Sequence, residues 1–197
     1  MAFNLKQEFL RKLIHLSSFW MVAMVWLLPR VWCILMLCTI TTIVLIADYE
    51  THKNSLCGRI YRFLFSSVLR EKEKDAAFGF SGAAYVLIAA LLLVVIMPKV
   101  VVMFALSVLL LCDTAAALVG RAIGHYRIIG KKTIEGTVAF VLSGMIVCML
   151  FNWGFGLPVY RALIGVFLGC MGDLLNEKIH IDDNLSIPLL TALPFLF

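Results

Sequence analysis

The sequence predicts an all-α, polytopic transmembrane helical bundle of six to seven spans with a cytoplasmic N-terminus. Hydrophobic residues fill 62% of the 197 positions, charged residues only 15%, and the mean hydropathy is +1.00. Soluble domains are about half apolar and about one-quarter charged, and a chain of this length has no interior large enough to hide the surplus. The apolar excess must therefore face lipid, and we expect residues 1–197 to form a single integral membrane domain.

Apolar runs long enough to cross a bilayer follow one another along the chain. A spanning helix needs about 20 largely apolar residues, with a lower limit of about 17. The first run has no signal-peptide cleavage site, so we expect it to be retained as a span. The apolar tail 185–197 contains Pro188 and Pro194, and is expected to be a seventh span or a re-entrant piece. The six candidate spans are 13–29, 31–47, 78–97, 100–119, 134–153 and 159–175.

The basic residues predict which end of each span faces the cytoplasm. If the spans alternate from a cytoplasmic N-terminus, all but three of the 17 Lys and Arg residues fall on the inner side, the exceptions being Arg30, Lys99 and Arg161. The net charge of +5 therefore indicates topology and contacts to anions, and no nucleic acid is expected as a partner. Helical spacing over 55–70 predicts an amphipathic helix on the inner surface, with a solvated loop as the alternative.

An aspartate lies about two turns inside the fourth span. Asp113 would cost about 2.5–3.5 kcal/mol in hydrocarbon on insertion scales, so it should face a polar cavity or a partner. Thr114 and the alanines at 115–117 are small enough to leave room beside it. The alternative is a structural ion pair with Arg121 or with another base that faces inward.

A basic, glycine-containing loop opens directly into the fifth span. Thr133 is the expected N-cap, and the helix start after it should favour an anion. Lys131 and Lys132 would add charge for a phosphate, while Gly136 would allow close approach of the backbone. The Walker A spacing is absent, so the segment is no P-loop. An ordinary basic loop is the alternative.

Acidic residues gather after the sixth span. Asp173 and Glu177 are four apart and share a helix face, and Asp182, Asp183 and Asn184 follow at the same inner rim. Hard oxygen ligands suit Mg²⁺, which takes one or two carboxylates together with substrate phosphates. A solvated acidic loop is the alternative.

Charged residues also recur at helical spacing at the start of the first span. Glu8, Arg11, Lys12 and His15 lie along one side of the predicted helix. An ionisable residue such as His15 inside a span is a candidate for function. The alternative is a lipid-surface anchor with a core histidine.

Taken in order, these motifs resemble the polyprenol kinase family, which contains dolichol, phytol and farnesol kinases and CTP-dependent diacylglycerol kinases. The resemblance covers nearly the whole chain. Serine hydrolase, zinc protease and dinucleotide fingerprints are absent. The matching motifs are Glu8…Arg11-Lys12-x-x-His15, Gly79-Phe80-Ser81-Gly82-Ala83-Ala84-Tyr85, Asp113-x-x-Ala116-x-x-x-Gly120-Arg121-x-x-Gly124, Lys132-Thr133-x-Glu135-Gly136 and Ile181-Asp182-Asp183-Asn184-Leu185-x-Ile187-Pro188.

The resemblance implies a multi-span fold, CTP as the usual phosphoryl donor, a divalent metal ion and a long-chain alcohol acceptor. The central motifs are also similar to CDP-diacylglycerol synthases, in which the aspartates matching Asp113 and Asp173 are associated with metal. The Pro-Gly-His-Gly-Gly stretch of those synthases is missing, and Asp-Asp-Asn-Leu-Ser-Ile-Pro stands in its place. This departure favours a kinase.

We therefore expect CTP-dependent phosphorylation of a lipid alcohol at the inner face of a membrane, most simply a bacterial inner membrane. The acceptor would be a polyprenol, phytol, farnesol or diacylglycerol. Mg²⁺ or another divalent cation would bind Asp113, Asp173 and Glu177; Arg121 would offset transition-state charge; and Asp182 or Asp183 would orient or deprotonate the alcohol. The nucleotide would contact Gly120, Arg121, Gly124, Lys131, Lys132, Thr133, Glu135, Gly136 and Asn184, and the substrate or its phosphate would contact Arg11, Lys12 and His15.

Two other functions remain open at this point. A cytidylyltransferase would act on a lipid phosphate with the same nucleotide. A small ion or solute transporter would use the buried carboxylates as a path. The oligomeric state is left open.

Overall fold

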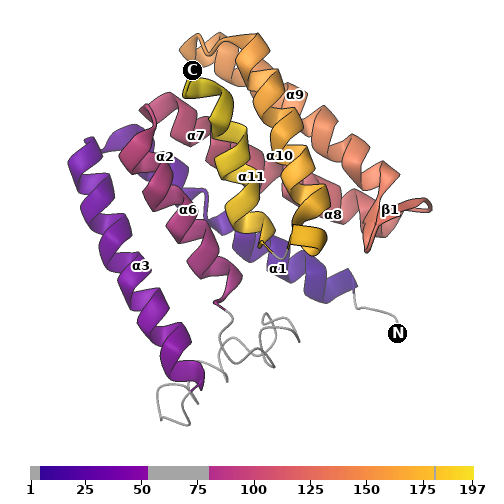
Figure 1. The fold of residues 1–197 in the computed structure, drawn as a ribbon, viewed down its shortest axis with the longest axis horizontal. Helices are drawn as coiled ribbons and strands as arrows, with labels where there is room; N and C mark the ends of the chain where they lie inside the picture. Colours follow the sequence, from indigo (N-terminus) through magenta and orange to yellow (C-terminus); the bar gives the residue numbers. More distant parts are fainter. Residues whose placement is uncertain (1–4, 53–79, 180) are drawn as a thin grey trace.

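The computed structural model describes residues 5–52, 80–179 and 181–197 (Figure 1). Within these ranges side chains are described from residue 11 onward, without those of residues 51, 52 and 177. The amphipathic helix predicted over 55–70 lies outside the described residues. The elements are α1 (Leu5–Ser17), α2 (Trp20–Leu27), α3 (Arg30–His52), α6 (Gly82–Ile96), α7 (Lys99–Ser107), the π-helix η1 (Val108–Cys112), α8 (Asp113–Ala122), β1 (Arg127–Ile129), β2 (Lys132–Thr133), α9 (Ile134–Phe155), α10 (Val159–Ile179), α11 (Asp183–Ala192) and the 3₁₀ turn η2 (Leu193–Phe195).

The all-α membrane fold is confirmed. Four helical stretches are long and apolar enough to cross a bilayer: Arg30–Glu50, Lys99–Ala122, Ile134–Phe155 and Val159–Asn176. Helix α6 is apolar but shorter. The chain is an integral membrane protein.

The first predicted span, 13–29, is wrong as a single helix, because the structure has α1 and α2 with a break at Ser18–Phe19. At the break the amides of Ser18 and Phe19 donate to the carbonyls three residues earlier, His15 and Leu16, at 3.1 and 3.0 Å. Ser17 Oγ also donates to the carbonyl of Ile14 at 2.6 Å. Hydroxyl groups that bond nearby carbonyls compete with helical bonds and tighten the last turn. The polar helix α1 is thereby separated from the apolar α2.

The tail of the chain forms a short helix. Helix α11 has 10 residues, which at about 1.5 Å per residue span about half of a hydrocarbon core. Figure 1 shows α11 running back antiparallel along α10. Helix α11 is therefore too short to be the full seventh span that was one of the two arrangements expected for 185–197.

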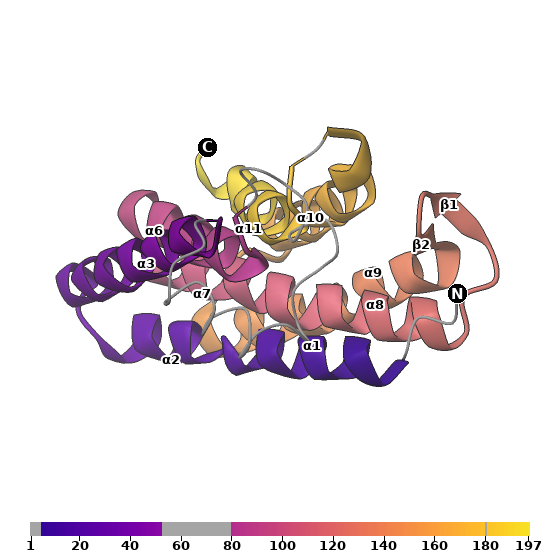
Figure 2. The same cartoon turned by 90° about the horizontal axis from the view of Figure 1, so that it is seen from below.

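The helix built from α7, η1 and α8 forms the core of the bundle. In its most apolar stretch of 18 residues, 78% of the residues are buried inside the protein, compared with 22% in the corresponding stretch of α3. Figure 2 shows α8 lying between α1 on one side and the α10–α11 pair on the other. Polar groups on this helix can therefore meet partners from several elements, away from lipid.

Two of the three basic residues predicted on the outer side close helix ends. Arg30 donates from Nε to the carbonyl of Val94 at 2.7 Å and from Nη2 to that of Met97 at 3.0 Å, at the end of α6. Lys99 Nζ donates to the carbonyl of Leu28, just beyond α2. The last carbonyls of a helix have no partner within it, and cations satisfy both their hydrogen bonding and the helix dipole. These contacts hold the short turns together at one end of the bundle.

A two-stranded hairpin stands where the sequence analysis expected only a loop. Strands β1 and β2 are antiparallel, with Arg127 opposite Thr133 and Ile129 opposite Lys132. Gly130 has a φ of 55°, the left-handed conformation that a tight turn requires and that glycine adopts readily. The hairpin leads Lys132 and Thr133 directly into α9.

Helices α10 and α11 approach so closely that one added methyl group between them should push them apart. A Cβ on Gly165 would lie 2.4 Å from the carbonyl oxygen of Thr191. Gly165→Ala should lower the free energy of unfolding by about 1–3 kcal/mol, the usual size of overpacking. Thermal unfolding in detergent measures the effect. Gly154→Ala is the matched control, because its Cβ would meet nothing within 4 Å; equal midpoints for the two variants would contradict the close approach.

Candidate active site

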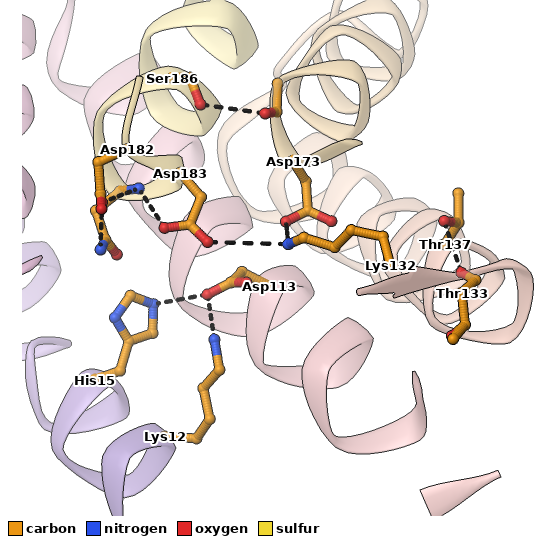
Figure 3. Close-up of polar contacts among 12 residues, drawn as sticks. Lys12, His15, Asp113, Lys132, Thr133, Thr137, Asp173, Asp182, Asp183 and Ser186 are labelled. Atoms are coloured by element: carbon orange, nitrogen blue, oxygen red, sulfur yellow. Dashed lines mark hydrogen bonds and ion pairs between the residues drawn. The ribbon is translucent and has the colours of Figure 1, made fainter. Parts of the chain in front are cut away.

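Three aspartates from separate elements converge in the interior. Asp113 begins α8, Asp173 lies near the end of α10, and Asp183 begins α11. They offer carboxylate oxygens that all lie within 4.8 Å of one another. The three residues are only 4%, 2% and 6% exposed. Figure 3 shows their carboxylates turned toward one another, so the structure brings together three of the acids that the sequence singled out.

Two lysines offset part of the charge of this carboxylate cluster (Asp113, Asp173 and Asp183). Lys12 from α1 forms an ion pair with Asp113, and Lys132 from β2 forms one with Asp173. Lys132 Nζ also lies 3.9 Å from Asp183 Oδ2. Burial alone would lower the pKa of Lys132, but the carboxylates of Asp173, Asp113 and Asp183 outweigh it and raise that pKa, so the ammonium stays charged. Both lysines were predicted from sequence as substrate or nucleotide contacts.

A π-helical turn lies immediately before Asp113. Segment Val108–Cys112 has the wider π geometry inside an otherwise continuous helix. Thr114 Oγ1 donates to the carbonyl of Leu110 at 2.6 Å, which gives that carbonyl a partner at the irregular turn. Such single-turn bulges are frequent at functional sites. No signal in the sequence identified this turn.

The α10–α11 pair places the other two carboxylates. Ser186 Oγ of α11 donates to the carbonyl of Gly172 on α10 at 3.3 Å. Asp182 caps α11 by accepting from the amide of Asn184 at 3.0 Å, and its Oδ1 also accepts from Asn184 Nδ2 at 2.8 Å. The backbone amide of Asn184 also donates to Asp183 Oδ1 at 3.1 Å. Asp182 is therefore engaged in capping, while Asp183 faces the cluster.

Helix α1 contributes a histidine beside the cluster. His15 Nε2 lies 3.6 Å from Asp113 Oδ2, and its side chain is 12% exposed. Among the described side chains, its Nε2 is a buried polar atom without a hydrogen bond. A buried polar atom left unpaired costs about 1–3 kcal/mol, which favours a ligand partner at this position. Arg11, also predicted to contact substrate, is partly buried on the same helix.

The predicted N-cap of α9 is confirmed, and the glycines around it pack closely. Thr133 Oγ1 accepts from the amide of Gly136 at 3.2 Å. A Cβ on Gly136 would lie 2.8 Å from the carbonyl of Ala116, and one on Gly120 would lie 2.9 Å from Thr133 Oγ1. A Cβ on Gly124 would lie 2.1 Å from the carbonyl of Gly120. In this structure these glycines let α8 and α9 touch; their contact with nucleotide stays a prediction.

The remaining predicted nucleotide contacts surround the hairpin. Glu135 Oε1 accepts from the amide of His125 at 2.9 Å and so fixes the loop that precedes β1. Arg121 and Lys131 are exposed. Arg121 follows Asp113 by eight residues on the same helix, a rise of about 12 Å. These three residues lie at the rim of the site, outside the carboxylate cluster.

Helix α10 carries two more residues near the cluster, of which Glu177 was predicted from the sequence and Asn176 was not. The side chain of Glu177, predicted as a metal ligand, is outside the described side chains. Asn176 was not singled out, yet its Oδ1 is buried without a hydrogen bond in the described part of the chain. Asn176 follows Asp173 by three residues, so the two share a helix face. This spacing was the signal available in the sequence.

The cluster has the chemistry of a divalent cation site. Hard carboxylate oxygens are the ligands that Mg²⁺ prefers, and it usually takes one or two of them and keeps sites for substrate phosphates. Asp113 and Asp173 fit this description, with Asp183 as a third acid within reach. Two ammonium groups beside them suit the phosphates that such an ion binds.

Known proteins resemble this chain over most of its length. The "Uncharacterized protein RP860" of Rickettsia prowazekii is 30% identical over 183 residues, which cover 91% of this chain and 88% of that one. The chain belongs to the same family. The "Uncharacterized protein MJ1137" of Methanocaldococcus jannaschii is also 30% identical, over 139 residues that cover 70% of this chain and 69% of that protein.

A relative with a descriptive name matches at lower identity. The "CTP-dependent diacylglycerol kinase 1" of Schizosaccharomyces pombe is 26% identical over 150 residues, or 68% of this chain. The match spans 66% of the yeast protein, just under two thirds of its length. No protein-family model matches the chain. No solved structure matches it either.

The pairing of Lys12 with Asp113 can be tested through stability. Lys12→Met should lower the free energy of unfolding by about 3–5 kcal/mol, because it leaves a buried carboxylate without its cation. Adding Asp113→Asn should recover part of this loss, since the remaining group is then neutral. Thermal unfolding in detergent compares both with Lys178→Met, which removes an exposed lysine. A Lys12→Met protein as stable as the Lys178→Met control would show that the ion pair is unimportant.

Proposed function

We propose that the chain is a phosphotransferase that moves the γ-phosphoryl group of CTP to the hydroxyl of a membrane lipid. The observation that carries this proposal is the convergence of Asp113, Asp173 and Asp183 with two lysines in one buried cluster. Phosphoryl transfer needs mainly positioning and charge neutralisation, and these groups supply both. The similarity to the fission yeast kinase supports CTP as donor and diacylglycerol as acceptor; a polyprenol, phytol or farnesol acceptor rests on the sequence motifs alone.

In the proposed site, Asp113 and Asp173 hold a divalent cation, with Glu177 one helical turn beyond Asp173. The ion would neutralise charge on the donor phosphates. Lys12 and Lys132 already lie against the carboxylates that would hold it, so their ammonium groups are placed to bind phosphate oxygens. His15 and Arg11, on the same helix as Lys12, would contact the acceptor or its new phosphate.

The acceptor hydroxyl lies next to Asp183 in this scheme. The hydroxyl oxygen forms a bond to the γ-phosphorus of CTP while the bond from that phosphorus to the β–γ bridging oxygen breaks, and CDP leaves. The hydroxyl proton passes to Asp183, which we prefer to Asp182 because Asp182 Oδ1 is engaged in capping α11. Arg121 would approach the phosphates from the rim.

The rest of the nucleotide would lie toward the hairpin. The start of α9, capped by Thr133, provides a positive helix end. Lys131, Glu135 and Asn184 complete the proposed contacts, together with Gly120, Gly124 and Gly136 where α8 meets α9. The positive-inside bias supports a cytoplasmic side for this end of the bundle, and the compact loops support a bacterial inner membrane.

Labelled nucleotide separates the proposed kinase from its alternatives. Purified protein in mixed micelles with diacylglycerol or an isoprenoid alcohol should move label from γ-labelled CTP to lipid and none from α-labelled CTP. Asp113→Asn should lose this activity while remaining folded. Transfer of the α label would indicate a cytidylyltransferase. Solute movement in liposomes without nucleotide consumption would indicate a transporter.

Variants of the three carboxylates should differ in the Mg²⁺ concentration that their activity requires. Asp173→Asn should raise the Mg²⁺ concentration needed for half-maximal activity, because it removes a ligand. Asp183→Asn should lower kcat by about 100-fold or more, the usual contribution of a general base, with little change in Mg²⁺ requirement. Titration of activity with Mg²⁺ for each variant measures both. A raised Mg²⁺ requirement in Asp183→Asn would instead make Asp183 a metal ligand, and in Glu177→Gln it would add Glu177 to the set.

A further inference from the structure

A buried carboxylate outside the cluster has no role in the reaction proposed above. Asp48 is 4% exposed and lies near the end of α3, a helix whose other face meets lipid. Its Oδ2 accepts two hydrogen bonds from Ser81, one from the amide and one from Oγ, both at 2.8 Å. Burying a carboxylate at a membrane depth is expensive unless it is well hydrogen-bonded. The paired contact to Ser81 therefore needs an explanation.

The contact fixes the start of α6. Ser81 is the N-cap of this helix, and its Oγ accepts from the amide of Ala84 at 3.3 Å. Because Asp48 holds both the backbone and the side chain of the cap, the first turn of α6 is tied to the end of α3. Rotation of the Ser81 side chain would break the two hydrogen bonds of its Oγ, and displacement of the whole residue would also break the bond from its amide.

The first residue of α6 lies directly against the active-site turn. A Cβ on Gly82 would come within 3.0 Å of Asn184 Nδ2. The same Nδ2 donates to Asp182 Oδ1 at 2.8 Å, and the backbone amide of Asn184 lies 3.1 Å from Asp183 Oδ1. Helices α6 and α11 also pack against each other. A shift of the first turn of α6 toward α11 would therefore press on Asn184, whose backbone amide is bonded to Asp183 Oδ1.

We propose that Asp48 is a positioning residue for Asp183. It acts through Ser81, the N-cap of α6, because α6 packs against α11 and leaves no room for a side chain between Gly82 and Asn184, so that the first turn of α11 keeps Asp183 facing the acceptor hydroxyl. The proposal rests on the kinase function proposed above. A displacement of about 1 Å at a reacting group can reduce the rate about 100-fold, so a contact of this kind can control kcat without touching substrate.

Two substitutions test the two ends of the connection. Asp48→Ala removes both hydrogen bonds to Ser81 and should lower kcat by about 10-fold or more, with the Mg²⁺ requirement unchanged. Asp48→Asn keeps an oxygen that can accept both bonds, so it should retain most of the activity. Gly82→Ala should lower kcat in the same way by pressing on Asn184, although alanine favours the helix itself by up to about 1 kcal/mol.

A matched control lies on the same helix. Thr41 is buried on α3, seven residues before Asp48, and among the described residues its Oγ1 has no hydrogen-bond partner. Thr41→Val should leave kcat unchanged. A purely structural role for Asp48 predicts a lower unfolding midpoint and unchanged kinetics in the folded fraction, and it predicts no effect of Gly82→Ala on kcat.

Amide hydrogen exchange tests the connection between Asp48 and the start of α11 without an activity assay. Amides of residues 182–187 should exchange several-fold faster in Asp48→Ala than in the wild-type protein or in Thr41→Val. Unchanged exchange there, or a wild-type kcat in Asp48→Ala, would overturn the positioning role. Absence of γ-phosphoryl transfer by the wild-type protein would instead overturn the kinase function, while the exchange experiment would still decide whether Asp48 orders the start of α11.

Discussion

Three carboxylates buried side by side are the constraint around which the bundle is arranged. Each buried ion carries a penalty of several kcal/mol that only close opposite charge can offset. The required cations come from two places, α1 and the hairpin before α9, which lie on different sides of the core helix (Figures 1 and 2). Lys12 and Asp113 are 101 residues apart in sequence. The ion pairs thus join the beginning, middle and end of the chain at one point.

The lysines and aspartates of the cluster would change partners when a nucleotide binds together with its metal ion. Under the proposed function, a divalent cation would bring positive charge to Asp113 and Asp173, while the phosphates of the nucleotide would bring negative charge to Lys12 and Lys132. The lysines would then turn from carboxylate to phosphate, so that these two aspartates and both lysines would each face an opposite charge in the empty and in the loaded form. His15 and Asn176, whose buried polar atoms lack hydrogen bonds in the described part of the chain, are placed to gain partners in the loaded form.

Much of the site could be predicted from the sequence because membrane burial makes polar residues conspicuous. Asp113 inside an apolar span, Asp173 near the end of another, and Lys12 at the start of the first each stood out against hydrocarbon. Thr133 followed from helix-capping preferences. Three-dimensional features were less accessible: the π turn at 108–112 has no sequence signature, the break at Ser18–Phe19 depends on local hydroxyl contacts, and the hairpin is too short for a period to emerge. Gly120 and Gly136, predicted to contact the nucleotide, also lie where α8 packs closely on α9, because a missing Cβ serves close helix packing as well as ligand approach.

The π turn before Asp113 also has a consequence for how this chain can vary. It accommodates one residue more than an α-helix of the same height, and each residue in a helix turns the next by about 100°. Side chains within the turn can be exchanged for others of similar volume without altering the direction of the aspartate. Loss of one residue there would let the turn close into an α-helix of the same height, so Asp113 would keep its place beside Lys12. A second loss would have no extra residue to absorb it and would turn Asp113 by about 100° away from Lys12, so the helix should tolerate the first deletion at this place far better than the second.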